Sequence, residues 1–256
     1  MRTLAAGALA LLVCPACATL REPAPRVGFA VDAAGISCRV AGPTRVVERN
    51  VFGASAIAQL DPRGDLEVVL VDEVAPCLHV GFATDGTRQG TVLGECPALP
   101  PRGRATARAG NDVVQARQTE DADAVQHIDV GYLTYDWPHA HFGIAYEGRP
   151  QLIEHRLVSP PGGPGGGEMS PALAALGEEE GDGFVLAWVE GGTVRAQPLF
   201  HGAEAAGPPV DIVLDHANDI GRPSVAFADN GTGLVAFTAS TPTGHHAFAV
   251  PIACSR

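Results

Sequence analysis

The sequence predicts an all-β fold built from repeated units of short strands. Three observations favour this class. A unit of two apolar runs joined by a Gly-containing turn occurs three times; Gly and Pro, which number 31 and 21 of 256 residues, fall mostly between such runs; and long amphipathic helical patterns are absent. Turn-rich chains with many short apolar runs are typical of sandwiches, barrels and propellers.

The repeated unit can be aligned on one alanine. Its three copies read SAIAQLDPRGDLEVVLV (55–71), PALAALGEEEGDGFVLAWV (171–189) and PSVAFADNGTGLVAFTA (223–239), with the alanine at positions 58, 174 and 226. The spacing predicts a fourth, less regular copy around Ala116, followed by the strand-like run Ile128–Tyr135. A period of roughly 50 to 60 residues with several short strands per unit is the signature of propeller blades.

The second run of the unit is apolar on consecutive residues in Phe184–Val189 and Leu234–Phe237. Both faces of such a strand must be buried, whereas a two-sheet sandwich would give a cleaner alternation. A propeller blade that packs between two neighbouring blades buries both faces of its inner strands. The segments Thr193–Leu199 and Val210–Leu214 alternate with polar residues, so we expect them to be more exposed outer strands.

These units predict a β-propeller of about four to five blades, with about eighteen strands in all. We expect about three strands in residues 27–52, about four in each of the next three units and about three in 221–252. Strands from both chain ends would complete one blade and close the ring, because an open sheet edge is a liability. The stretch Ser159–Gly167 is interpreted as a connection inside this single domain.

Residues 1–18 read as an export signal, with Arg2 in the positive region and the apolar stretch Thr3–Val13. The sequence is compatible with two ways of processing this signal. Cleavage after Ala18 would release residues 19–256 as a secreted or periplasmic chain, whereas acylation of Cys14 or Cys17 would anchor the chain to a membrane through a lipid. The predicted location is therefore the periplasm, the cell surface or the extracellular space.

Four cysteines remain after the signal: Cys38, Cys77, Cys96 and Cys254. An even number in an exported chain is most simply two disulfides, and four cysteines allow three pairings. We favour Cys77 with Cys96, which closes a local loop, and Cys38 with Cys254, which joins the chain ends. A metal site is the weaker alternative because no two of them have a Cys-x-x-Cys spacing.

The formal charge of −12 argues against nucleic acid as a partner, because such a surface repels phosphate. No later stretch reaches the roughly 18 apolar residues of a membrane helix, so membrane attachment would be N-terminal only. We expect a monomer with no cofactor and with an unidentified protein or glycan as its ligand. The sequence contains no nucleophile elbow, phosphate-binding loop or His-Glu-x-x-His motif, and we assign no catalytic, cofactor-binding or metal residues.

The sequence contains two histidine pairs that are candidate metal ligands. His139 and His141 would project from one face of a strand and could share a metal, but they are read more simply as surface residues. His245 and His246 are adjacent and would point to opposite faces, so we interpret them as turn residues.

Two acidic stretches lie in predicted turns. Glu178–Asp182 could hold calcium, but consecutive glutamates do not have the alternate spacing of a calcium loop, so a solvated turn is favoured. Asp229–Gly233 is typical of a tight turn, since Asn and Gly tolerate positive φ.

The pattern Pro-x-Val/Leu-Ala, a Gly-containing turn, then Phe/Leu-Val-x-Ala-Trp/Phe, resembles the propeller-type repeats of proteins and lipoproteins exported by predatory, GC-rich soil bacteria of the myxobacterial type. The resemblance covers 169–252 well, 53–100 moderately and 101–157 poorly. It implies an architecture and carries over no catalytic residues. Two functions follow as hypotheses: an exported non-catalytic binding or scaffold module, or an exported propeller-type glycoside hydrolase with carboxylates near the central channel.

Overall fold

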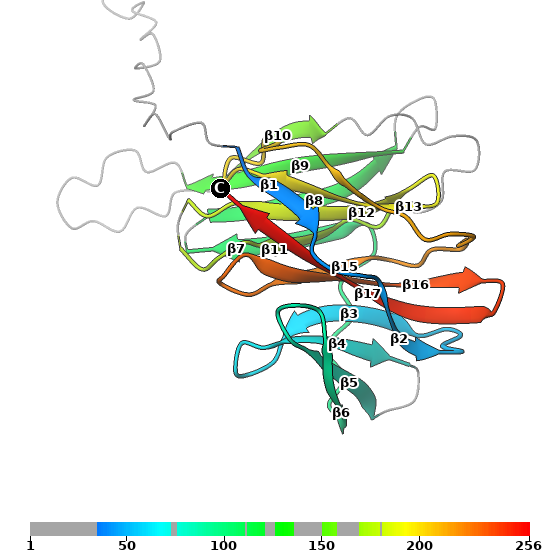
Figure 1. Ribbon diagram of the computed structural model, residues 1–256. Coiled ribbons are helices and arrows are strands. Elements are labelled where there is room, and N and C mark those ends of the chain that lie inside the picture. The colour runs from blue at the N-terminus through cyan, green and yellow to red at the C-terminus, as the bar shows by residue number, and fades with distance from the viewer. Residues whose placement is uncertain are drawn as a thin grey trace, which may run out of the picture. The chain divides into compact units, whose positions relative to one another are not determined.

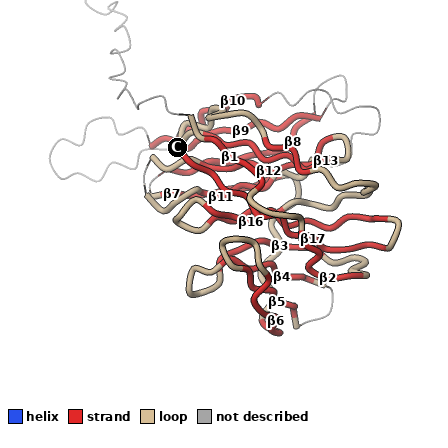
Figure 2. Tube along the Cα trace, in the orientation of Figure 1, coloured by secondary structure: helices blue, strands red, loops and turns tan. Residues whose placement is uncertain are grey.

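The computed structural model describes residues 35–72, 76–110, 112–120, 126–135, 150–157, 169–179 and 181–256. These residues form seventeen strands in four antiparallel sheets, and no helix occurs among them (Figures 1 and 2). Consequently no helix of the described ranges could cross a membrane. The predicted signal, residues 1–18, belongs to a separate unit, Met1–Ala34, that lies outside the described residues.

Three of the sheets are each made from four consecutive strands, so every internal unit of the repeat is one antiparallel meander. The β3–β6 sheet contains β3 (Ser55–Leu60), β4 (Leu66–Val71), β5 (Cys77–Phe82) and β6 (Arg88–Gly94); the β7–β10 sheet contains β7 (Arg104–Ala109), β8 (Asp112–Glu120), β9 (Gln126–Tyr135) and β10 (Pro150–Leu157); the β11–β14 sheet contains β11 (Ala172–Ala175), β12 (Phe184–Glu190), β13 (Thr193–Leu199) and β14 (Val210–Ile212).

The fourth sheet, here called the terminal sheet, joins the two ends of the described chain. It contains β15 (Ser224–Phe227), β16 (Thr232–Thr241) and β17 (Gly244–Ser255), and both β1 (Ser37–Val40) and β2 (Arg45–Arg49) pair with β17. Strands from both ends therefore share one sheet. The described N-terminal strands number two, and residues 27–34 of the segment in which about three were expected lie outside the described ranges.

Two disulfides are present, and they join the pairs that the sequence analysis favours. Cys38 of β1 lies directly opposite Cys254 of β17 in the strand register and is bonded to it, with a Cα–Cα distance of 4.1 Å. Cys77 at the start of β5 is bonded to Cys96 just after β6.

The second strands β12 and β16 are buried on both faces, as their consecutive apolar residues predict. Alternation divides the side chains of β12 between two cores: Phe184, Leu186 and Trp188 pack against the β7–β10 sheet, while Val185 and Ala187 pack against the terminal sheet. In β16, Leu234 and Ala236 pack toward the β3–β6 sheet and the intervening residues pack toward the β11–β14 sheet. The strand must be apolar throughout because both neighbours are sheets.

The first strands of the four units contact one another in succession. β3 contacts β15, β15 contacts β11, and β11 contacts β7, an order that can be followed in Figure 1. Small residues at Ala58, Ala174 and Ala226 suit this close approach. Among the described residues, no contact of comparable extent joins the β3–β6 sheet to the β7–β10 sheet.

Two details of the repeat differ from the prediction. The fourth copy begins earlier than Ala116, which lies in β8; the aligned alanine is Ala107 of β7, opposite Val114. The start of this copy was not recognisable from the sequence because alternate residues of β7 are polar. β13 is mostly buried, not exposed, because the segment after it folds back and the backbone N–H of Ala206 donates to the carbonyl of Pro198 at 2.9 Å.

Candidate functional site

A cavity lies on the β7–β10 sheet, on the face directed away from the β11–β14 sheet. The packed face of β8 carries Val114 and Ala116, which belong to the core shared with β12. Residues between them in sequence project from the opposite face, because side chains alternate along a strand. That second face is polar.

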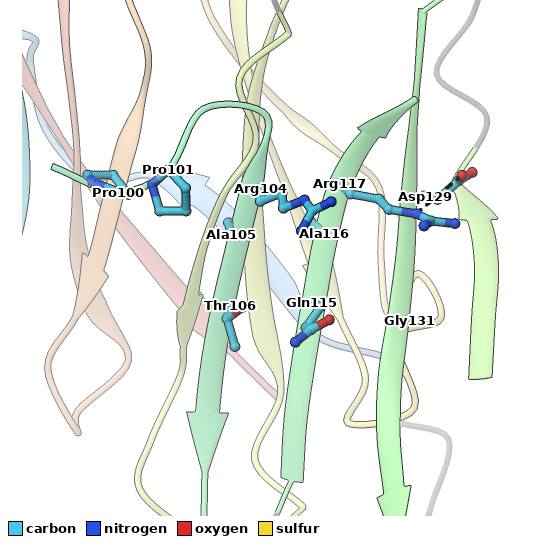
Figure 3. Close-up of a pocket in the computed structure, with 10 residues that line it drawn as sticks. All are labelled: Pro100, Pro101, Arg104, Ala105, Thr106, Gln115, Ala116, Arg117, Asp129 and Gly131. Carbon is cyan, nitrogen blue, oxygen red and sulfur yellow. Dashed lines mark ion pairs between the residues drawn. The ribbon is translucent and has the colours of Figure 1, made fainter. Parts of the chain in front are cut away.

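Two cross-strand rows form this polar face. The register places Arg104 opposite Arg117 and Arg117 opposite Asp129; the next row on the same face joins Thr106, Gln115 and Gly131. Figure 3 shows the arginine and aspartate side chains extending along the first row, across β7, β8 and β9. The arrangement depends on the register, since a slip by one residue would exchange the two faces.

We call this cavity, of about 450 Å³, the arginine cleft. It is lined by Pro100, Pro101, Arg104, Ala105, Thr106, Gln115, Ala116, Arg117, Asp129 and Gly131. The two prolines belong to the segment that leads into β7, and Arg222 Nη1 donates a hydrogen bond of 3.3 Å to the carbonyl of Pro100. One side of the cleft is therefore a proline-containing segment tied to the segment preceding β15.

The first row is made mainly of charged residues, and the strand register continues it from Asp129 to Arg156 of β10. Arg117 Nε lies 4.0 Å from Asp129 Oδ2, which also accepts a 3.0 Å hydrogen bond from Thr119 Oγ1. The Asp129 side chain is 12% exposed and that of Arg117 is 47% exposed, so the carboxylate is held under the guanidinium. Arg104 is exposed, and within the described ranges its guanidinium has no hydrogen bond or ion pair. Like charges directly opposite on a sheet destabilise it.

A second cavity, the inner-strand cavity, is lined by residues from all four first strands and has a volume of about 320 Å³. Its charged lining residues are Arg108, Glu178 and Asp229; the remainder is mainly small or apolar and includes Ala58, Ala174 and Ala226. The Arg108 side chain is positioned by a 2.6 Å hydrogen bond from Nε to the carbonyl of Gly110. This cavity brings together residues from every unit of the repeat.

A third polar cluster lies on β3, β4 and β5. Gln59 Nε2 donates to Glu67 Oε1 at 2.7 Å, and His79 Nδ1 lies 3.2 Å from both carboxylate oxygens of Glu67. His79 Nε2 lies 2.9 Å from the carbonyl oxygen of Glu95. Each ring nitrogen therefore lies within hydrogen-bonding distance of an oxygen, of Glu67 or of Glu95. The cluster satisfies its own groups.

The acidic turn Glu178–Asp182 lies between β11 and β12, as predicted, although residue 180 is outside the described ranges. Asp182 Oδ1 pairs with Arg256 Nη2 at 2.7 Å, so the carboxylate holds the C-terminal residue. Among the described residues no group of three His, Cys, Asp or Glu is arranged to hold a metal ion. Asp229–Gly233 contains the predicted turn, with Gly231 at a φ of 76° and Thr232 N donating to Asn230 Oδ1 at 3.0 Å.

The histidine pairs have different outcomes. His139 and His141 lie outside the described residues. The interpretation of His245 and His246 as turn residues is wrong: both belong to β17, which begins at Gly244. His245 Nδ1 lies 2.9 Å from Ser240 Oγ, and the buried His246 packs edge-on against the ring of Phe248. The turn is shorter than the sequence suggested because the strands pair as far as Thr241 and Gly244.

The comparisons add no relative. The chain matches no family model and no curated protein. Its function must therefore be argued from its geometry. The arginines of the cleft were not selected from the sequence, since only the pairing of β7 with β8 and β9 brings Arg104, Arg117 and Asp129 together. The one available signal was the polar alternation in RATARA and VQARQ.

Proposed function

We propose that this protein is an exported binding module of the bacterial envelope or extracellular space, and that it holds a small polar ligand in the arginine cleft. The observation that carries the proposal is the polar, concave face of the β7–β10 sheet. Ligand sites are typically concave and place a few convergent polar groups on a rigid support. Here Arg104, Arg117 and Gln115 are supported by neighbouring strands of one sheet.

The four sheets, in this proposal, are four propeller blades. The succession of first-strand contacts, the shared inner-strand cavity and the pairing of β1 and β2 with β17 support it. A crystal structure with the first strands β3 and β7 next to each other around that cavity would agree. An open stack of sheets, with β3 and β7 at its two ends and no common axis, would contradict it.

Export is part of the proposal, and the two disulfides support it because such bonds persist in oxidising compartments. Intact mass and detergent partitioning of the protein from its native host test it. A chain beginning at Thr19 in the soluble fraction would indicate secretion, and a lipid-modified Cys14 or Cys17 would indicate an N-terminal membrane anchor. An uncleaved chain retained in the cytoplasm would contradict the proposal.

Binding is tested with the mature chain on a glycan panel and on envelope fractions. The cleft variant is Gln115→Leu, and its matched control is Gln89→Leu, an exposed glutamine of β6 outside the cleft. We expect the wild type and Gln89→Leu to retain the same ligand and Gln115→Leu to lose it. Absence of any retained ligand, or equal retention by both variants, would contradict binding in the cleft.

A hydrolase is the second candidate, because Glu178 and Asp229 line the inner-strand cavity together with Arg108. Paired carboxylates on either side of a bound sugar are the machinery of most glycosidases. Turnover of aryl-glycosides that is abolished in Glu178→Gln and Asp229→Asn, and retained in the neighbouring Glu179→Gln, would support this function. No turnover by the wild type across a broad panel would remove it.

A further inference from the structure

We infer that the inner-strand cavity binds a short peptide with free termini, whose carboxylate is held by Arg108 and whose ammonium group is held by Glu178 and Asp229. This is a second site, separate from the arginine cleft, with a different class of ligand. The inference therefore goes beyond the proposed function and does not depend on it.

The cavity lies where the first strands of the four units end. Arg108 is the last residue but one of β7, and Glu178 and Asp229 come shortly after the ends of β11 and β15. The first strands contact one another in succession, from β3 through β15 and β11 to β7 (Figure 1). The cavity thus brings together one charged residue from each of three units.

These three charged side chains are exposed, and none of them neutralises another. Arg108 Nε donates a 2.6 Å hydrogen bond to the carbonyl of Gly110, which leaves both terminal nitrogens of the guanidinium group available. Among the described residues, neither Glu178 nor Asp229 has a side-chain hydrogen bond or lies within 4.0 Å of a basic group. Opposite charges that line one cavity and remain apart can be bridged by a ligand that carries both charges.

Both carboxylates belong to turns that are held from outside. In the turn between β11 and β12, the backbone N–H of Gly181 donates to Asp112 Oδ2 of β8 at 2.7 Å. In the turn between β15 and β16, the carbonyl of Gly231 accepts a 2.8 Å hydrogen bond from the backbone N–H of Cys254 of β17. A binding site is most selective when its polar groups are fixed before the ligand arrives.

The chemistry of the three groups selects a zwitterion. A guanidinium group binds a carboxylate in a planar, bidentate geometry, and an ammonium group has three donors that two carboxylates can share. A simple anion would face two carboxylates, and a simple amine would leave Arg108 without a partner. The formal charge of the whole chain, −12, also disfavours an anion. A peptide has its two terminal charges apart, as the cavity has.

The size and lining of the cavity favour a peptide of small apolar residues. A volume of about 320 Å³ is near the lower end for ligand pockets, which extend from about 300 to 1,000 Å³. The aligned alanines of three units leave this space open. The uncharged lining is mainly small or apolar: Ala58, Leu60, Ala174, Ala175, Val225, Ala226 and Phe227.

The test is calorimetric titration of the mature chain with L-alanyl-L-alanine, with its N-acetyl form, which lacks the ammonium group, and with its C-terminal amide, which lacks the carboxylate. The variants are Arg108→Gln, Glu178→Gln and Asp229→Asn. The matched control is Glu179→Gln, an exposed neighbour that does not line the cavity. We expect each cavity variant, and each blocked peptide with the wild type, to bind about tenfold or more weakly, the effect of a lost charge-assisted hydrogen bond. Glu179→Gln should bind as the wild type does.

The pairing of each terminus with its residues gives a readout that a folding defect cannot imitate. Arg108→Gln should bind the dipeptide and its amide alike, because the group that distinguishes them is gone. The double variant Glu178→Gln/Asp229→Asn should in the same way bind the dipeptide and its N-acetyl form alike. An Arg108→Gln protein that still prefers the acid to the amide would overturn the assignment.

Equal binding of the three peptides by the wild type, or binding of none of them, would also overturn the inference. The arginine cleft would be untouched by that result, since it is tested with glycans and Gln115→Leu. Turnover of aryl-glycosides that is lost in Glu178→Gln, without any dipeptide binding, would instead assign these carboxylates to a hydrolase and refute the peptide site.

Discussion

The disulfide between the chain ends should stabilise the protein more than the local one. Cys38 and Cys254 are 216 positions apart, and Cys77 and Cys96 are 19 apart. In the chain-entropy description a cross-link restricts the unfolded state by an amount that grows with the logarithm of the closed loop. At 25 °C this gives about 5 kcal/mol for the long loop and about 3 kcal/mol for the short one. The difference, about 2 kcal/mol, is measurable.

The structure adds a reason for the same ranking. Cys38 holds β1 on β17, and β2 pairs with β17 as well, so the bond protects an attachment made by strands of four and five residues. Cys77 and Cys96 fasten only the end of one meander. Loss of the long-range bond therefore frees the described N-terminal strands as well as enlarging the unfolded ensemble.

The assay compares two double variants of the mature chain, Cys38→Ala/Cys254→Ala and Cys77→Ala/Cys96→Ala, in urea. The buried Trp188 reports unfolding by fluorescence, and linear extrapolation gives the free energy of unfolding. A small domain has only about 5 to 15 kcal/mol in total, so the first variant should lose at least about a third of its free energy of unfolding. If it proves as stable as the second variant, or more stable, the reasoning from loop length and strand attachment is refuted.

Three further predictions concern the fold. Phe237→Ala removes a fully buried ring between two sheets and should lower the free energy of unfolding, measured in urea, by about 3 to 5 kcal/mol. A loss below about 1 kcal/mol would contradict the assigned core. Gly231→Ala should lower the free energy of unfolding by at least about 1 kcal/mol more than Gly64→Ala does. Both glycines have positive φ, but only at Gly231 would an added Cβ lie 2.5 Å from a backbone carbonyl oxygen. Equal losses in the two variants would contradict this close approach. The backbone N–H of Asp65 and the contacts of Arg63 lower the pKa of Asp61 below its ordinary value of 3.8. The ionised Asp61 side chain therefore stabilises the folded state fully at pH values above 3.8, and this stabilisation is lost as the pH falls through the lower pKa of the folded protein. Asp61→Asn should therefore lower the melting temperature at pH 7, and melting curves should converge with those of the wild type in strong acid; a constant difference would show that the charge is irrelevant.

The sequence predicts most strongly those elements whose burial leaves a pattern in one segment alone. The sequence predicts β12 and β16 because consecutive apolar residues have no other simple explanation in a turn-rich chain, and it predicts β4 from the alignment of the repeat. The sequence does not mark β7 strongly, because its packed face carries only alanines and so produces no apolar run; the polar alternation of RATARA is a weaker signal. β13 was misjudged because its cover comes from a later segment, which alternation cannot reveal.

The candidate site was beyond prediction for a related reason. Arg104, Arg117 and Asp129 are separated along the chain by the lengths of two hairpins, and only the hydrogen-bond register makes them one row. A shift by one residue would have turned Arg117 toward the core, so residue type alone could not identify the site. The inner-strand cavity has the same origin, since Arg108, Glu178 and Asp229 come from three units.

The place of the cleft also follows from how the sheets pack. Three of the sheet-to-sheet contacts bury apolar side chains on both partners, and the sides of the β3–β6 and β7–β10 sheets that take no part in them carry polar rows instead. On the first of these sides Gln59, Glu67 and His79 satisfy one another. On the second, two arginines face each other across a strand pair with one carboxylate beside them. A self-satisfied cluster gains little from a ligand, whereas the polar face of the β7–β10 sheet is hollowed into a cleft, so this side is the better placed of the two to receive an external partner.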